Sequence, residues 1–206
     1  MRAVVTWSQY RESIGDRSGL FHALVDAWPI ERALYPGSYV DLSPSTAIPT
    51  VTYVDTDVRA VRFFAETDRA RTELADRTRR GAGVDVRFLA ADYTHDLDVP
   101  EQSMDLLISL YAGPVWAHTC RYLRPGGWLL ANTSHGDASL AALDESLDLV
   151  AAVDHRDDRY RLVTHGLEDY LIPKRPETAD ADLIRSSGRG IAYTRSSFAY
   201  LFQCSE

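Results

Sequence analysis

Residues 104–111 read Met-Asp-Leu-Leu-Ile-Ser-Leu-Tyr, which is a nearly continuous apolar run. Strands that are buried on both faces of a parallel sheet show such runs, whereas half-exposed strands alternate apolar and polar residues. Two runs precede it, TVTYV at 50–54 and VDVRFLA at 84–90, and WLLA at 128–131 follows it. Helical patterns lie between these runs. This alternation predicts an α/β fold with a Rossmann-like, doubly wound, mostly parallel sheet and helices on both faces.

The whole chain, residues 1–206, is expected to form one domain with three parts. These are a helical segment at 1–29, a core at 30–149, and C-terminal strands with a polar loop at 150–206. Apolar residues at helical spacing, with Gly and Pro as stops, predict helices at 10–28, 57–80, 114–123 and 138–149. The remaining predictions are a loop at 174–190 and a closing strand at 197–203.

The composition excludes several classes of protein. Basic residues number 22 and acidic residues 30, so the net charge is −8, and no basic stripe is present to bind a nucleic-acid backbone. The sequence contains no run of about 18 apolar residues, so no membrane span is predicted. The N-terminus lacks the apolar core of a secretory signal. We therefore expect a cytoplasmic protein. Cys120 and Cys204 are far apart and the six His form no ligand-spaced pair, so no metal site is expected.

Acidic residues follow the predicted strands at the edge where parallel sheets bind ligands. Asp55 and Asp57 follow TVTYV, and Asp92 follows the next strand. An ionised carboxylate only accepts hydrogen bonds, which suits ribose hydroxyls, while Asp92 with Tyr93 suits the edge and face of a purine. The alternative is that these Asp residues start turns and cap helices. Both interpretations remain open at this point.

Four segments carry a resemblance to a known family, in the family's order. They are YVDTD at 53–57, AD at 91–92, MDLLIS at 104–109 and LRPGGWLL at 123–130. Over residues 30–134 the chain resembles the class I S-adenosylmethionine (SAM)-dependent methyltransferases.

The resemblance implies a seven-stranded sheet with an antiparallel C-terminal strand pair, and SAM as the cofactor. It implies that Asp55 binds the ribose and Asp92 the adenine amine. It also implies that the end of the 104–109 strand faces the methyl group, where Ser109 is small enough to let a ligand approach.

The first loop departs from the family's acidic-x-Gly-x-Gly-x-Gly pattern. The corresponding stretch, ALYPGSYVDLSPS at 33–45, retains Gly37 alone, and Tyr39 adds bulk where the methionine tail would lie. About one helical turn fits between Ser43 and Pro49. A helix N-terminus still offers free amides to an anion, so Gly37 and Ser43 are the candidate ligand residues here.

Candidate catalytic residues lie in the loops after the first, fourth and fifth predicted strands. Asp41 is either a base or a turn former, and Tyr111 lies where the family places substrate contacts. His135 suits acid–base chemistry near neutral pH. Asp137 either orients His135 or caps the following helix. No GxSxG elbow is present, which argues against a serine hydrolase.

Five arginines of the C-terminal part form either an anion site or a solvated face paired with nearby aspartates. They are Arg156, Arg159, Arg161, Arg185 and Arg189. The single lysine, Lys174, lies in the predicted loop without an assigned role.

The leading functional hypothesis is SAM-dependent methyl transfer to a small molecule. One alternative keeps the fold without SAM and catalyses an intramolecular displacement or elimination that closes a ring in specialised metabolism. Another is a non-catalytic partner subunit. A homo- or hetero-oligomer is compatible with each of them.

Overall fold

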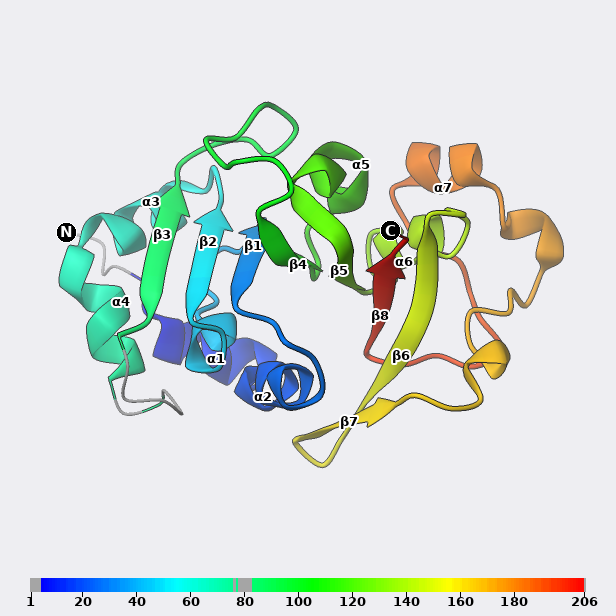
Figure 1. Ribbon diagram of the computed structural model, residues 1–206, viewed down its shortest axis with the longest axis horizontal. Helices are drawn as coiled ribbons and strands as arrows, with labels where there is room; N and C mark the ends of the chain where they lie inside the picture. The colour runs from blue at the N-terminus through cyan, green and yellow to red at the C-terminus, as the bar shows by residue number, and fades with distance from the viewer. Residues whose placement is uncertain (1–4, 76, 78–82, 206) are drawn as a thin grey trace.

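A computed structural model describes residues 5–75, 77 and 83–205. One sheet of eight strands crosses the molecule in the order β3-β2-β1-β4-β5-β8-β6-β7 (Figure 1). Neighbouring strands from β3 to β5 are parallel, whereas β8 is antiparallel to both β5 and β6, and β7 is antiparallel to β6. The strands are β1 (Arg32–Pro36), β2 (Thr50–Val54), β3 (Asp85–Leu89), β4 (Met104–Ser109), β5 (Leu123–Ala131), β6 (Leu147–Arg156), β7 (Arg159–Val163) and β8 (Ala199–Cys204).

Most of the helices are short. They are α1 (Trp7–Ile14), α2 (Ser18–Ala27), α3 (Val58–Ala65), α4 (Thr67–Leu74), α5 (Val115–Thr119), α6 (Asp137–Ala141) and α7 (Ala181–Ser187). Between β1 and β2 there is only a 3₁₀ helix, Ser43–Thr46, whose four residues are buried. Helix α2 packs against it. The N-terminal segment therefore helps to cover the sheet where the helix between β1 and β2 is short.

The two faces of the sheet bury separate apolar clusters. In β4, Leu106 and Ile108 point to the face covered by α1 to α4, whereas Leu107 points to the face covered by α6. This arrangement confirms the predicted α/β class with helices on both faces. The first face buries Trp7, Phe21, Phe63 and Leu74, and the second buries Tyr122, Ala138 and Ala141.

The sheet has one strand more than the seven expected. Strand β7 pairs with β6 through a two-residue hairpin turn at Asp157 and Asp158, whose φ angles are +49° and +56°. Two consecutive left-handed residues match the twist of a tight hairpin, and Asp tolerates that conformation better than most residues. The antiparallel C-terminal arrangement that the resemblance implied is present in β8 and β6.

Two predicted helices are each divided in two. The 10–28 helix is interrupted at Gly15, whose φ of +84° ends α1. The 57–80 helix is interrupted at Glu66, whose extended ψ of 91° separates α3 from α4. Residues 76 and 78–80 of that prediction lie outside the described residues.

Two other predictions were wrong in part. The 138–149 helix ends at Ala141, and Leu147 already belongs to β6 because it pairs with Cys204 of β8. The 174–190 loop contains α7, whose N-cap Asp180 accepts a hydrogen bond from Leu183 N–H at 2.8 Å. A capping Asp before this segment was the available sequence signal.

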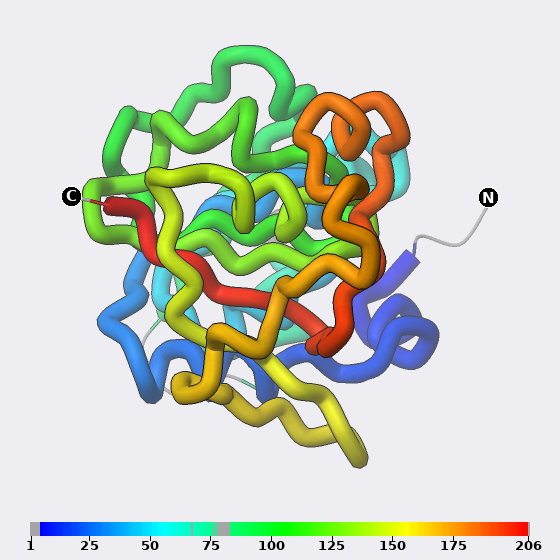
Figure 2. Tube along the Cα trace, turned by 90° about the vertical axis from the view of Figure 1, so that its right-hand side faces the viewer, coloured from blue at the N-terminus to red at the C-terminus, as the bar shows by residue number. Residues whose placement is uncertain are grey.

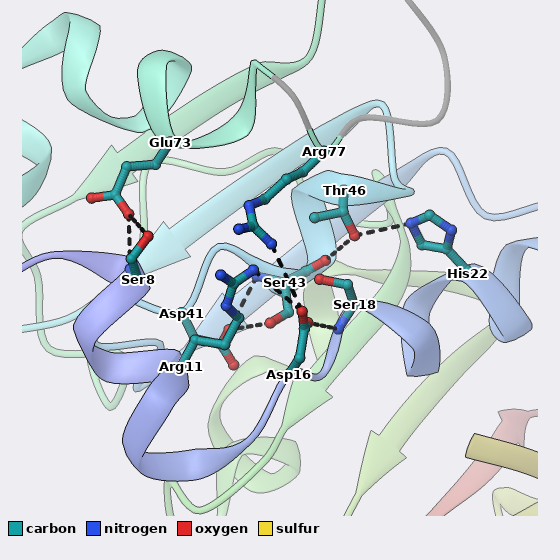
Figure 3. A network of polar contacts seen from close by, with 10 residues as sticks. All are labelled: Ser8, Arg11, Asp16, Ser18, His22, Asp41, Ser43, Thr46, Glu73 and Arg77. Atoms are coloured by element: carbon teal, nitrogen blue, oxygen red, sulfur yellow. Dashed lines mark hydrogen bonds and ion pairs between the residues drawn. The ribbon is translucent and has the colours of Figure 1, made fainter. Parts of the chain in front are cut away.

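Polar contacts attach the N-terminal helices to the core (Figure 3). Glu73 of α4 accepts hydrogen bonds from the N–H of Trp7 at 3.2 Å and of Ser8 at 2.8 Å, so it satisfies free amides at the start of α1. His22 of α2 contacts the Thr46 hydroxyl at 3.2 Å. These contacts attach α1 to α4 and α2 to the 3₁₀ helix that follows β1.

Candidate functional site

The candidate site lies at the rim, by which we mean the loops that follow the carboxyl ends of β1 to β5. Gly37 N–H donates to the Val54 carbonyl at 2.8 Å, which brings the β1 and β2 loops together. Asn132 N–H donates to the Ser109 carbonyl at 3.2 Å, which does the same for the β5 and β4 loops. In a doubly wound sheet this edge is where ligands bind.

Asp55 organises the first loop. Its Oδ2 accepts the N–H of Tyr39 and its Oδ1 the N–H of Asp57, each at 2.7 Å. Gly37 and Tyr39 have φ angles of +64° and +49°, so the loop alternates left-handed residues although only the first is glycine. A side chain in this conformation costs about 1–2 kcal/mol, and the bond to Asp55 offsets it. Each Asp55 oxygen retains a lone pair for a further donor.

The Tyr39 ring lies between an aromatic and a cationic neighbour. Its centroid is 4.9 Å from that of Tyr10, edge to face, and 5.1 Å from the Arg59 guanidinium carbon. Arg59 in turn pairs with Asp57 at 2.7 Å, and this hydrogen bond holds the pKa of Asp57 below its usual range. Asp57 also accepts the Arg59 N–H as the N-cap of α3. The structure thus places Asp57 in a capping role.

Gly37 permits the β1 and β4 loops to touch. A Cβ at this position would lie 2.5 Å from the Cβ of Ala112, which is too close for any side chain. The Tyr93 hydroxyl donates to the Ala112 carbonyl at 2.7 Å, so the β3 loop joins the same contact. The protein's own packing therefore accounts for Gly37.

Asp41 is fully buried and has four hydrogen-bond donors around it. Its Oδ2 lies 3.2 Å from Arg17 Nη1 and 3.4 Å from the Tyr35 hydroxyl. Its Oδ1 accepts the Ser43 N–H at 3.0 Å and the Ser43 hydroxyl at 2.6 Å, the latter pair drawn in Figure 3. Asp41 is thus the anion at the start of the 3₁₀ helix, and the Ser43 amide is already satisfied.

Arg17 connects this buried charge to the surface. Its guanidinium carbon lies 4.8 Å from the centroid of the Tyr111 ring, and 46% of Tyr111 is exposed. Tyr111 has a φ of +63°, and its N–H donates to Asn132 Oδ1 at 3.4 Å. Strained non-glycine residues concentrate at functional sites, and here Tyr39 and Tyr111 lie in neighbouring loops of the rim. The sequence pattern did not identify Arg17 as a candidate, because an arginine beside an apolar stripe is usually solvated.

Asp92 presents an exposed carboxylate at the end of β3. It accepts the Thr94 N–H at 2.9 Å and the Thr94 hydroxyl at 2.8 Å. Both hydrogen bonds lower the pKa of Asp92, and the bond from the Thr94 N–H has the larger effect. The neighbouring Tyr93 is half-buried and directs its hydroxyl to Ala112, so its ring is held in a fixed position.

His135 and Asp137 do not form a pair in the described contacts. His135 is exposed in the turn after β5. Asp137 is only 2% exposed and accepts the Trp116 N–H at 3.2 Å. Burial raises the pKa of Asp137 to about 6. It is the first residue of α6, whose N-cap is Gly136, so neither role expected for Asp137 is realised.

Residues 5–75, 77 and 83–205 contain neither a candidate metal cluster nor a helix that could span a membrane. No group of three or more His, Cys, Asp or Glu side chains there could hold a metal ion. Every helix in this part of the chain is too short or too polar to cross a bilayer.

No protein-family model matches the sequence, and no curated protein matches it either. Among solved structures, the [4+2]-cyclase SpnF superposes with a TM-score of 0.51 at 14% identity, covering 91% of this chain and 80% of SpnF. The chain has the class I methyltransferase fold. At this identity the likeness concerns the fold alone.

Two further solved structures are also similar. The N-methyltransferase NodS from Bradyrhizobium japonicum WM9 has a TM-score of 0.48 at 13% identity, with 97% of both chains covered. A methyltransferase in complex with the Haloferax volcanii Trm112 activator has a TM-score of 0.48 at 15% identity, covering 97% of this chain and 95% of that one.

Gly37→Ala tests the contact between the β1 and β4 loops. We expect a loss of about 2–4 kcal/mol in the free energy of unfolding. The alanine would have to adopt the left-handed backbone conformation of Gly37, and its Cβ would be overpacked against Ala112. Gly126→Ala is the matched control: its φ is +69° but no atom lies within 4 Å, so it should lose only about 1–2 kcal/mol. Urea denaturation measures both, and equal losses would contradict the packing explanation.

Arg17→Met tests the buried ion pair. It leaves Asp41 charged and without its cation, so we expect a loss of about 3–5 kcal/mol in the free energy of unfolding. The double variant Arg17→Met/Asp41→Asn should recover most of this loss, since the charge is removed while an acceptor for Ser43 remains. A double variant no more stable than the single one would show that Arg17 acts through its packing.

Asp137→Asn tests the buried carboxyl. The pKa in the fold is about 6 and the ordinary value is 3.8, so the stabilising protonated form is present at low pH and is lost as the pH rises through 6. The difference corresponds to about 3 kcal/mol. We expect the melting temperature of Asp137→Asn relative to wild type to rise between about pH 4 and pH 6 and to stay level above that range. The exposed control Asp98→Asn should show no such trend.

Proposed function

We propose that this protein is an enzyme that transfers a methyl group from SAM to a small molecule at the rim. The observation that carries the proposal is the Asp55 carboxylate, which is half-buried at the end of β2 and retains one free lone pair on each oxygen. Ribose hydroxyls are donors that suit these positions. The exposed Asp92 carboxylate would accept from the adenine amine, with the Tyr93 ring beside it.

The amino-acid end of SAM would meet a different set of groups from the glycine-rich loop of the family. The Ser43 amide already bonds Asp41, and Gly37 is packed against Ala112. Arg17 has a buried Nε without an acceptor in the described structure. A guanidinium donor of this kind is satisfied by a carboxylate. Because this Nε is enclosed and the same guanidinium pairs with Asp41, it is not open to a carboxylate of SAM, and the described residues fit the ribose and adenine end of the cofactor only.

SAM supplies an electrophilic methyl group when bound. The chain's own contribution is to hold the acceptor in line with it, for which the rigid loops around Tyr39 and Tyr111 provide fixed walls. Asp41 is fully buried and surrounded by donors, which leaves the exposed His135 as the better placed group to accept a proton from the acceptor.

Asp55→Ala tests the proposed cofactor site by calorimetry with SAM and S-adenosylhomocysteine. A hydrogen bond to a charged group contributes about 1.5–3 kcal/mol, so losing this carboxylate should weaken binding by about tenfold or more. Asp98→Ala, at an exposed carboxylate on the adjacent surface, should bind as wild type does. Circular dichroism checks that Asp55→Ala is folded. Absence of binding to the wild-type protein would overturn the proposal.

A second candidate function keeps the fold and the rim but dispenses with SAM. It is favoured by the direct contact of Gly37 with Ala112, which closes part of the crevice between the β1 and β4 loops. SpnF, a [4+2]-cyclase, has the same fold. In this alternative the rim would hold a single substrate for ring closure, and the calorimetric experiment separates the two functions.

A further inference from the structure

A pocket lies outside the groups used so far, in the long connection from β7 to β8. Its volume is about 520 Å³, within the range of small-molecule sites. The connection winds around the β6–β8 end of the sheet and is amber to orange in Figure 2. The residues that define the pocket's chemistry are Lys174, Arg175, Leu183, Ile184, Arg189 and Ile191.

The cations of this pocket are unpaired. Within residues 5–75, 77 and 83–205, no acidic side chain lies within ion-pair distance of Lys174, Arg175 or Arg189. Two nearby acids are engaged elsewhere, because Asp182 pairs with Arg185 at 3.2 Å and Asp180 caps α7, while Glu177 forms no ion pair with a described residue. Three free cations around one pocket are unexpected in a chain whose net charge is −8.

The rest of the lining is apolar. Ile184 is buried at the base of the pocket, and Leu183 of the same helix is 51% exposed. Ile191 lines the pocket from the segment that follows α7. A ligand with one charged end and one apolar end would therefore satisfy both parts of the lining.

The pocket shares a wall with the rim. A Cβ on Gly190 would lie 2.0 Å from the Thr133 carbonyl oxygen, and one on Gly136 would lie 2.7 Å from Ile184 Cγ2. Both glycines permit the connection to pack directly on the turn that carries His135. Ile184 and Gly190 of the pocket lining therefore separate a molecule in the pocket from the turn that carries His135, and none of the groups proposed for SAM lines the pocket.

We propose that this pocket binds a small amphipathic anion, namely a carboxylate with a short alkyl chain. Lys174, Arg175 and Arg189 hold the carboxylate, and Leu183, Ile184 and Ile191 cover the chain. This site is distinct from the proposed cofactor site, and its existence does not depend on methyl transfer.

Calorimetry with octanoate tests the proposal, with octylamine as the probe of opposite charge. Octanoate should bind the wild-type protein and octylamine should not. The double variant Lys174→Gln/Arg189→Gln should weaken octanoate binding at least about tenfold, which corresponds to about 1.4 kcal/mol. Arg185→Gln is the matched control, because Arg185 lies on α7 but pairs with Asp182, and it should leave the affinity within about twofold.

Nuclear magnetic resonance supplies a second readout. Octanoate should shift the imidazole signal of His135, identified by its loss in His135→Gln, because the pocket wall packs on that turn. Equal binding of octanoate and octylamine, or unchanged affinity in the double variant, would overturn the proposal. Octanoate binding without SAM binding would reject the proposed function and leave this site intact. SAM binding without octanoate binding would reject this site and leave the proposed function intact.

Discussion

The buried ion pair between Arg17 and Asp41 is the contact on which the rim depends. Asp41 holds the start of the 3₁₀ helix through Ser43, and Arg17, the residue before α2, contacts the Tyr111 ring. A charge that is removed from water requires an opposite charge or several donors, and Asp41 has both. Helix α2 also reaches β7, where the Tyr160 ring packs at Gly19. The ion pair thus couples the N-terminal segment to the first loop, and α2 itself contacts the far end of the sheet.

The parallel core could be predicted from the sequence because each buried strand is a short apolar run. TVTYV at 50–54 became β2 with the same bounds, and the run at 104–111 became β4, which ends two residues earlier, at Ser109. The prediction was wrong where an apolar spacing suits both helix and strand, as at Leu147 and Leu149. There the pairing with β8 decides, and single-sequence periodicity does not contain that information.

The candidate site was only partly accessible to sequence reasoning. The rule that ligands bind at strand carboxyl ends brought Asp55, Asp92 and Tyr111 to one rim. Burial could not be predicted. Asp41 was expected as a base or a turn former, and it is enclosed and accepts the Ser43 N–H two residues later. Asp137 was expected to orient His135 or to cap a helix, and it is a buried carboxyl. Arg17 became relevant only because α2 folds back on the first loop. These outcomes depend on tertiary contacts between segments far apart in the chain.

The hairpin that adds β7 also determines which strand edges of the sheet are exposed to pairing with another chain. β7 and β3 are the two outermost strands, and their exposed positions carry Arg159 and Arg161 on one and Asp85 and Arg87 on the other. An unpaired strand edge is a template for uncontrolled pairing between chains, and charged side chains along it oppose that growth. Any assembly of this protein is therefore expected to use its helices and loops, with the continuous sheet confined to a single copy.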